Sequence, residues 1–478
     1  MYKGSITESD IRDLAFRIYE DFPVIKLIRD FAVDNGYEVY VVGGFVRDYL
    51  LGTPRADIDF SVAGDGPEFA EKLSAAIGGS EITVFRRFRT AYIRYQDFDL
   101  EFVGARKESY SEYSRNPEVI EGSFEDDIAR RDFTINAMAI ALSGDRRDTF
   151  TDLYNGLQDL KSGLIRTPLE PGVTFSDDPL RIMRAIRFAS VLGFVIEDKT
   201  LEGIAANSER ITIVTQERIT EEFLKILGSP NPGAGLRLLY ETGVMKHIFP
   251  EAAIMGGIEQ RKDYHHKDVF YHTCEVVDNI SQKTDDVWLR FAALVHDIAK
   301  PQTKKFIEGT GWTFHGHEEL GAKMMKYIFR RMKLPLNRLE YVKTLVRLHL
   351  RPIALVSEEV TDSAIRRLIV EAGEALEDLM TLCRADITSK NRDKVTKFLK
   401  NYDRVMDKVR EVKIKDELRA FQSPVRGDEI MQICGLKPGR TVGDIKSAIE
   451  EAILEGEIPN TYEAALLYLH SIKNKFIK

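Results

Sequence analysis

The stretch Val41-Val42-Gly43-Gly44-Phe45-Val46-Arg47-Asp48, followed by Asp57-Ile58-Asp59, decides the fold of the N-terminal part of this chain. Apolar residues lead into a glycine pair, and a helical pattern of apolar residues opens directly after it. Glycine lets the backbone approach an anion closely, and the N-terminus of the following helix points N–H groups outward. The pattern therefore predicts a phosphate-binding turn between a strand and a helix.

Two aspartates follow this turn in the run from Ala56 to Val62, which has the composition of a strand. Side chains two residues apart on a strand share one face, so Asp57 and Asp59 project together beside the glycine turn. Neighbouring carboxylates repel each other unless a cation lies between them, and oxygen ligands suit Mg²⁺. A phosphate cradle beside a divalent-metal site indicates phosphoryl or nucleotidyl transfer.

This order of elements resembles the signature GG-x-(hx)RD…DxD of the polymerase-β superfamily, in the form found in class II tRNA CCA-adding enzymes and bacterial poly(A) polymerases. Arg130-Arg131-Asp132-Phe133-Thr134-Ile135-Asn136-Ala137 matches the second motif of that family. The segments from Asp152 to Leu160 and from Ser208 to Leu227 resemble its third and fifth motifs. The resemblance covers residues 25 to 250 and implies that Glu101 is the third catalytic acid.

The fourth motif of the family begins near Asp177 and continues as a helix, which we expect to start at Asp177 or Asp178. In the family, an E-D-x-x-R element binds the Watson–Crick edge of the incoming base. Here its Asp and Arg are Asp178 and Arg181, and Asp177 replaces the usual Glu. Asp178 is also compatible with a simple helix cap.

Arginine forks bind phosphate oxygens in pairs, and a side-chain amide can bind a sugar hydroxyl. The resemblance implies Asp57, Asp59 and Glu101 as catalytic acids, with Mg²⁺ at Asp57 and Asp59. It implies a nucleotide-binding set of Gly43, Gly44, Arg47, Arg130, Arg131, Asp132, Asn136, Asp178, Arg181, Arg184 and Arg187.

A second site is indicated further along the chain, where histidines are densest between His265 and His317. His272, His296-Asp297 and Asp386 resemble the ligand set of the HD superfamily of metal-dependent phosphohydrolases. Imidazole suits transition metals, so this set implies a divalent ion such as Mn²⁺, Ni²⁺ or Mg²⁺. His317 and His349 stand where some HD families place ligands of a second metal, although His349 is equally compatible with a structural role.

The resemblances together imply an α+β chain. A small polymerase-β-like nucleotidyltransferase head, with a mixed sheet and helices, is followed by an elongated all-α neck, body, HD domain and tail. We expect the head at residues 1–165, the neck and body at 166–250, the HD domain at 251–405 and the helical tail at 406–478. Within the head, the polar segment from Glu108 to Phe124 lacks periodicity and predicts a mobile loop.

The composition fits a multidomain globular protein, with 478 residues of which 44% are hydrophobic and 30% charged. We expect no membrane span, because no apolar run approaches the ~20 residues that a bilayer requires. The N-terminus lacks a signal-peptide pattern, and three distant cysteines argue against disulfides, so we expect a cytoplasmic protein. Since the net charge is −8, RNA binding requires segregated basic residues, as between Lys390 and Lys415.

The leading interpretation is a tRNA nucleotidyltransferase that adds or repairs the 3′-terminal CCA. Its partners would be tRNA, CTP and ATP, with two Mg²⁺ ions in the head and a phosphohydrolase activity at the HD site. The alternatives are a bacterial poly(A) polymerase, an A-adding or CC-adding enzyme, an HD phosphohydrolase with an inactive head, and a non-catalytic RNA-binding module. The segment from Phe85 to Tyr92 lacks the Gly and His of a poly(A) polymerase element, and CC-adding members tend to lack the predicted loop. The HD metal and the oligomeric state stay open.

Overall fold

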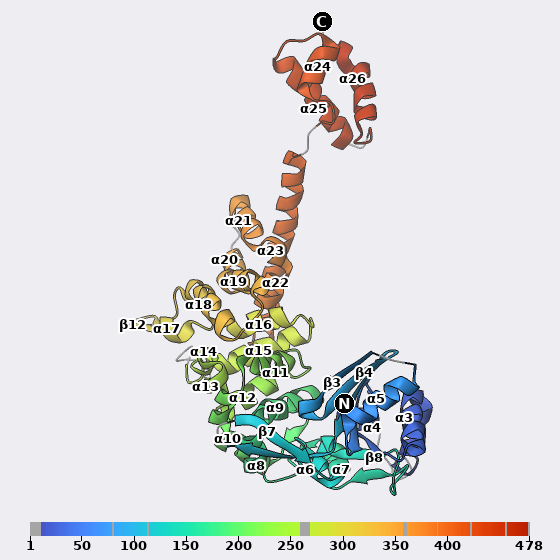
Figure 1. The fold of residues 1–478 in the computed structure, drawn as a ribbon. Coiled ribbons are helices and arrows are strands. Elements are labelled where there is room, and N and C mark those ends of the chain that lie inside the picture. Colours follow the sequence, from blue (N-terminus) through green and yellow to red (C-terminus); the bar gives the residue numbers. More distant parts are fainter. Residues whose placement is uncertain are drawn as a thin grey trace. The chain divides into compact units, whose positions relative to one another are not determined.

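The computed structural model describes residues 11–78, 81–111, 114–258, 268–356, 361–389, 391–420, 423–454 and 457–476, with only the backbone for 106–111, 114–121, 416–420 and 454. The chain divides into two compact units (Figure 1). One unit comprises Met1–Leu350 and Glu374–Val395, and the other comprises Arg351–Gly373 and Thr396–Lys478. In the described part of the chain, no helix is both long and apolar enough to span a bilayer.

The head is built on a seven-stranded mixed sheet with the order β3-β4-β5-β2-β1-β8-β9. β2 and β5 pair in parallel, and the other neighbours are antiparallel. This sheet, with a mostly helical remainder, confirms the predicted fold class. The strands are β1 (Glu38–Val42), β2 (Asp57–Ala63), β3 (Glu81–Phe85), β4 (Thr90–Tyr95), β5 (Phe98–Gly104), β8 (Met138–Ala141) and β9 (Phe150–Asp152).

The glycine turn lies at the centre of this sheet. β1 is apolar and largely buried, as expected of a strand covered on both faces, and α4 (Gly44–Leu50) begins directly after Gly43. The register pairs Val42 with Asp59, so the antiparallel strands bring the aspartates of β2 beside the turn. The helices α2 (Leu14–Asp21), α3 (Pro23–Asp34) and α5 (Gly66–Ala76) complete the first half of the head.

The segment predicted to be a mobile loop is instead a two-stranded antiparallel ribbon. β6 (Arg106–Ser111) pairs with β7 (Ser114–Glu121), so the loop prediction was wrong. Polarity and Pro117 had indicated a loop. However, both strands of an isolated ribbon are edge strands, where polar side chains and a residue without an N–H are tolerated.

The fourth motif is divided between two helices. α8 (Pro171–Asp177) ends just before Asp178, and α9 (Leu180–Leu192) begins after Pro179, so the predicted helix start was two to three residues early. Asp178 is extended, with φ −133° and ψ 97°, because the ring of a following proline disfavours helical backbone.

The rest of the first unit is mainly helical. Its elements are α6 (Phe124–Ala129), α7 (Gly156–Ser162), β10 (Leu164–Ile165), β11 (Val195–Ile196), α10 (Asp198–Ala206), α11 (Gln216–Leu227), α12 (Pro232–Glu241), α13 (Met245–Ile248), α14 (Pro250–Ala253), α15 (Val269–Ser281), α16 (Val287–Val295), α17 (Lys300–Thr303), β12 (Lys305–Ile307), β13 (Gly311–Thr313), α18 (His317–Arg331), α19 (Leu339–Leu348) and α22 (Leu376–Ala385).

A buried arginine joins the neck to these later helices. Arg290 on α16 is 2% exposed and donates hydrogen bonds to the carbonyls of Leu227 (3.1 Å), Ser229 (2.8 Å) and Thr284 (2.9 Å). Leu227 is the last residue of α11, whose terminal carbonyls have no partner within the helix. Arg290 therefore satisfies a helix end that burial would otherwise leave unpaired.

The second unit is helical and has its own core. It contains α20 (Arg351–Ala354), α21 (Asp362–Ala372), most of α23 (Arg392–Ala420), α24 (Gly427–Cys434), α25 (Arg440–Leu454) and α26 (Tyr462–Phe476). Val425, Ile430, Ile445, Ile449 and Leu469 form part of the core around α24, α25 and α26.

Candidate active site and metal centre

The three predicted acids lie on neighbouring strands of the head sheet. Asp57 is exposed and Asp59 is half-buried on β2, while Glu101 lies on β5 in register with Asp59. Partners in a parallel pair point to the same face and lie about 4.8 Å apart. The three carboxylates therefore face one side of the sheet.

Burial raises the pKa of Asp59, and the charge of Asp57 adds to this effect, whereas Arg131 opposes it. Two carboxylates that raise each other's cost of ionisation attract a cation, and hard oxygen ligands fit Mg²⁺. The donor set of the head thus fits a divalent magnesium site.

Most of the predicted nucleotide-binding residues surround one cavity of about 340 Å³. Gly43 has φ +79°, and a Cβ atom there would lie 2.7 Å from Arg131 Nη1 and 3.2 Å from Asp59 Oδ2. The turn therefore requires glycine for its backbone and for the space that Arg131 occupies. The predicted residues that line the cavity are Gly43, Gly44, Arg47, Asp57, Asp59, Arg131, Asp132, Asn136, Arg184 and Arg187.

A buried relay of polar groups holds the arginines of this cavity. Arg47 Nη1 donates to Asn136 Oδ1 (2.5 Å), and Asn136 Nδ2 donates to Asp132 Oδ1 (2.9 Å). Arg184 Nε donates to Asp132 Oδ2 (2.7 Å). Burial alone would raise the pKa of Asp132, but Arg184 and Asn136 outweigh it and lower the pKa to about 2. Asp132 therefore stays ionised and fixes the arginines.

Sequence reasoning missed the contribution of Phe188 to the cavity. Its ring lies 4.2 Å from the guanidinium carbon of Arg187 and 4.8 Å from that of Arg47. The face of an aromatic ring attracts cations, so Phe188 orients guanidinium groups toward the cavity. The signal available in the sequence was that Phe188 directly follows Arg187, a predicted nucleotide-binding residue. Phe45, Asp48 and Arg55 also line the cavity without having been predicted as site residues.

Four predicted residues lie outside the lining of this cavity. Arg130 forms an ion pair with Asp127 (2.5 Å), and its carbonyl accepts a hydrogen bond from Arg181 Nη2 (2.5 Å). Asp178 Oδ1 accepts from the N–H of Leu180 (3.2 Å), the first residue of α9, and Pro179 rather than Asp178 is the N-cap of that helix. Glu101 lines a neighbouring cavity with Tyr92 and other residues. The role of Asp178 and Arg181 in base selection stays a prediction.

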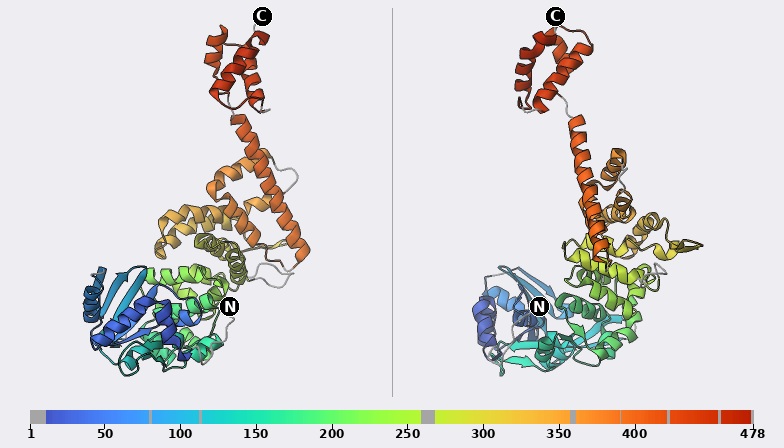
Figure 2. Two further views of the ribbon diagram at one scale, coloured as in Figure 1. Left: turned by 90° about the vertical axis from the view of Figure 1, so that its right-hand side faces the viewer. Right: turned by 180° about the vertical axis from the view of Figure 1, so that it is seen from behind.

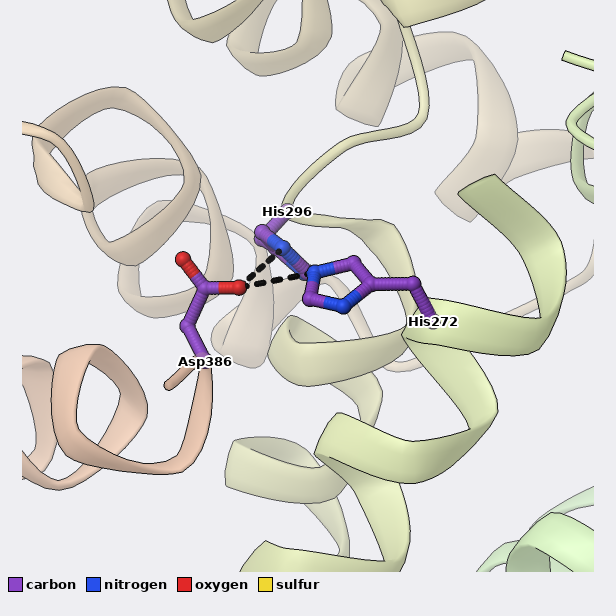
Figure 3. A group of neighbouring side chains, drawn as sticks. All are labelled: His272, His296 and Asp386. Carbon is purple, nitrogen blue, oxygen red and sulfur yellow. Dashed lines mark hydrogen bonds and ion pairs between the residues drawn. The ribbon is translucent and has the colours of Figure 1, made fainter. Parts of the chain in front are cut away.

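The HD residues also come together, as two groups of possible metal ligands in the described part of the chain. The first group contains His272 on α15, His296 after α16 and Asp386 after α22 (Figure 3). Asp386 Oδ1 lies 2.8 Å from His272 Nε2 and 3.5 Å from His296 Nε2.

The second group contains Asp297, His317 and His349, all of them buried. Asp297 Oδ1 lies 3.2 Å from His317 Nε2, and Asp297 Oδ2 lies 3.2 Å from His296 Nε2. Asp297 thus has one oxygen toward each group. The structure brings His317 and His349 together at Asp297, and the resemblance to HD families had placed possible ligands of a second metal at these two histidines.

The orientation of the histidines fits metal binding. Nδ1 of His296, His317 and His349 donates to the carbonyls of Ala293 (2.7 Å), Phe314 (2.7 Å) and Val346 (2.6 Å), respectively. Nε2 of each ring therefore faces the cluster, and in the neutral imidazole this atom carries the lone pair that ligates a metal. The Nε2 atoms of His317 and His349 lie 3.3 Å apart, so two lone pairs face each other unless a cation lies between them.

The charge of the cluster also attracts a cation. Burial opposes protonation of His296, but Asp297 and Asp386 outweigh it and raise the pKa of the imidazole to about 10. Burial and the charge of His296 lower the pKa of His349 to about 4, so this ring stays neutral and available as a ligand. Imidazole and carboxylate ligands together fit Mn²⁺, Ni²⁺ or a similar divalent ion.

Three models of known families match segments of the chain, and two of these segments contain most residues of the sites described above. Residues 39–166 match the poly A polymerase head domain, residues 193–255 match a probable RNA and SrmB-binding site of polymerase A, and residues 269–389 match the HD domain. The head, with its glycine turn and paired aspartates, is that of a nucleotidyltransferase.

Related proteins and structures narrow this class. An A-adding tRNA nucleotidyltransferase of Deinococcus radiodurans is 32% identical over 433 residues, which cover 89% of this chain and 93% of the relative. A CC-adding tRNA nucleotidyltransferase of Thermus thermophilus is 29% identical over 92% of this chain and 95% of its own length. The apo form II structure of a CCA-adding enzyme shares the fold, with a TM-score of 0.60 and 23% identity over 95% of this chain and 96% of that one. The chain belongs to the family of the CCA- and A-adding tRNA nucleotidyltransferases, and it is an enzyme of that class.

Proposed function

We propose that this enzyme adds or repairs the 3′-terminal CCA of tRNA from CTP and ATP. The observation that carries this proposal is the meeting of the glycine turn, Asp57, Asp59 and the arginines around one cavity. A multifunctional CCA protein of Dechloromonas aromatica, 31% identical over 74% of this chain and 84% of its own length, also supports it.

Each group in the head has a defined part in the proposed reaction. Arg47, Arg131 and Arg184 bind and orient the triphosphate, and the N–H groups at the start of α4 lie beside it. Asp57, Asp59 and Glu101 would hold Mg²⁺, which would supply Lewis-acid chemistry toward the triphosphate and the attacking 3′-hydroxyl. The hydroxyl oxygen of the tRNA bonds to the α-phosphorus of the nucleotide, pyrophosphate leaves, and the hydroxyl proton passes to solvent.

A specific second candidate is an enzyme that adds only the terminal A. The 32% identity to an A-adding relative, over 93% of that relative, favours it. The two candidates differ in their requirement for CTP. Incubation with tRNA lacking CCA, tRNA ending in CC, and each radiolabelled nucleotide alone separates them.

CCA addition predicts that CTP labels the first RNA and that ATP labels the second. An A-adding enzyme labels only tRNA ending in CC. Incorporation of many A residues on either RNA would instead indicate a poly(A) polymerase, and no incorporation at all would refute an active head.

For the second site, we propose a metal-dependent phosphohydrolase acting on 2′,3′-cyclic or 2′-phosphorylated nucleotide ends. His272, His296, Asp297 and Asp386, with His317 and His349, would hold divalent metal, which supplies Lewis-acid chemistry toward a phosphate ester. Water adds to phosphorus, the bond from phosphorus to the 2′ or 3′ oxygen breaks, and the leaving oxygen takes the proton. Where the bond to the 3′ oxygen of the cyclic phosphate breaks, such a reaction would restore the 3′-hydroxyl that nucleotide addition needs.

A metal screen tests this activity. We expect hydrolysis of 2′,3′-cyclic CMP with at least one of Mg²⁺, Mn²⁺, Ni²⁺ and Co²⁺. No hydrolysis with any of them, under conditions where nucleotide addition is robust, would leave the HD helices as a scaffold.

A further inference from the structure

A short ribbon of two strands separates the metal ligands Asp297 and His317. β12 and β13 pair antiparallel, with Phe306 opposite Trp312. In Figure 1, and in the right-hand view of Figure 2, this yellow ribbon projects from the helices next to it. It contributes little to a core, because Phe306 is 53% exposed and Trp312 is 38% exposed.

The ribbon combines an aromatic surface with positive charge. The ring of Trp312 lies edge-on to Phe306, with 5.2 Å between centroids, and Lys304 Nζ lies 4.4 Å from the centre of the Trp312 ring. Lys305 is exposed on β12. An aromatic ring beside lysines suits single-stranded nucleic acid, since a base stacks on the ring and the lysines attract phosphates.

Residues next to both ends of the ribbon contact side chains of the HD ligand groups. Lys300, on the helix before it, lies 2.5 Å from Asp297 Oδ2 through its Nζ and 5.6 Å from the ring of Phe314. The carbonyl of Phe314, just after the ribbon, accepts the hydrogen bond from His317 Nδ1. Trp312 precedes Phe314 by two residues, so their Cα atoms lie at most about 7 Å apart.

We propose that the β12–β13 ribbon is the nucleotide-docking surface of the HD site. The base of a 3′-terminal nucleotide stacks on Trp312, and Lys304 binds the adjoining phosphate. The terminal phosphate then lies at the histidine and aspartate cluster. This assignment rests on the proposed phosphohydrolase activity for its catalytic consequence, but the binding step stands independently of it. It makes the HD site specific for nucleotide ends rather than for phosphate esters in general.

Tryptophan fluorescence tests the binding step. The chain has two tryptophans, and Trp288 is buried with 9% exposure, so Trp312 dominates any response to a stacked base. The probe is an RNA pentamer with a 3′-hydroxyl, which offers no phosphate end to hydrolyse and is used without nucleotides. We expect quenching in the full-length protein and its loss in Trp312→Ala. Absence of quenching in the unsubstituted protein would overturn the proposal.

Hydrolysis kinetics test the specificity. The substrates are 2′,3′-cyclic CMP and glycerol 1,2-cyclic phosphate, which carries the same five-membered phosphodiester without a base. Their ratio of kcat/KM should fall at least about fivefold in Trp312→Ala, the effect expected when a stacking aromatic is removed. Trp312→Phe should retain most of the preference. Lys304→Ala should leave it unchanged, because neither substrate has an adjoining phosphate, and should instead weaken binding of the RNA pentamer.

Tyr327→Ala is the matched control, because Tyr327 is an aromatic residue of α18 that is 64% exposed and lies ten residues beyond His317. Its substrate ratio should equal that of the unsubstituted protein. An unchanged ratio in Trp312→Ala, or an equal fall in Tyr327→Ala, would overturn the proposal. If no metal supports hydrolysis, quenching that depends on Trp312 would still establish docking while refuting the phosphohydrolase.

Discussion

At the scale of single residues, nucleotide addition should depend most strongly on the paired aspartates of β2. Asp57→Ala and Asp59→Ala should each lower nucleotide addition to below about 1% of the unsubstituted rate, because each removes a ligand from the proposed magnesium site. Single-turnover incorporation with tRNA and CTP measures this. Asp65→Ala is the control: Asp65 caps α5 by accepting from the N–H of Glu68, so its loss costs about 1 kcal/mol of stability and spares addition. Substantial activity in either β2 variant would contradict the metal assignment.

The glycine turn allows an equally specific test. Gly43→Ala should raise KM for the nucleotide about tenfold or more. The new methyl group would lie 2.7 Å from Arg131 Nη1, which is too close, so the guanidinium group must move. Gly36→Ala is a matched control, since Gly36 also has a positive φ of +67° but no atom within 4 Å of the added Cβ. Gly36→Ala carries backbone strain of about 1 kcal/mol, and Gly43→Ala, at φ +79° and ψ −139°, carries about 1–3 kcal/mol. Equal KM values in the two variants would show that displacement of Arg131 does not limit nucleotide binding.

At the scale of helices and strands, Arg290 links α16 to the end of α11. Arg290→Ala should lower the free energy of unfolding by about 3 kcal/mol, because several buried carbonyls lose their donor. Arg410→Ala should change it by less than about 0.5 kcal/mol, since Arg410 is exposed and forms a surface ion pair with Asp407 three residues earlier. Denaturant unfolding of both variants measures the difference. A loss below 1 kcal/mol in Arg290→Ala would show that water can replace the arginine.

The elements differ in how far the sequence predicts them. Strands β1, β2, β4 and β5 were predictable because their apolar pattern is local, and the turn between β1 and α4 has a fixed sequence. The β6–β7 ribbon was not, since its polar strands pair only with each other. The break between α8 and α9 at Asp178 and Pro179 follows from the effect of a proline ring on the residue before it. In the sequence, the same proline had been interpreted as part of the first turn of one helix.

The residues of the two sites also differ in how far the sequence predicts them. The sequence predicted the residues of the head cavity because they belong to contiguous motifs. It did not predict that Arg130 would pair with Asp127, or that Phe188 would contact three arginines, since both facts depend on tertiary packing. The resemblance to HD families pointed to His317 and His349 as possible ligands of a second metal, but their meeting at Asp297 depends on the packing of α18 and α19 and could not be read from their spacing.

At the scale of the whole molecule, two sites of different chemistry should act independently. Asp297→Ala should abolish hydrolysis of 2′,3′-cyclic CMP and leave nucleotide addition within about twofold. Asp297 belongs to one HD ligand group and has an oxygen 3.2 Å from His296 of the other, whereas it does not line the head cavity. Asp59→Ala should give the opposite result. Parallel assays of the two variants, with bound metal measured by mass spectrometry, decide the matter. Loss of both activities in either variant would show that the sites are coupled.

The division of the chain into two units bears on how such enzymes exchange parts during evolution or in the laboratory. The backbone passes between the units three times, after Leu350, Gly373 and Val395. Within the second unit, Asp362 of α21 forms ion pairs with Lys408 (3.7 Å) and Lys415 (3.2 Å) of α23, which lie beyond the last crossing. A chimera made by one junction near residue 396 would therefore combine an α21 and an α23 from different parents. A functional exchange of the second unit must therefore take Arg351–Gly373 and Thr396–Lys478 together from the same parent.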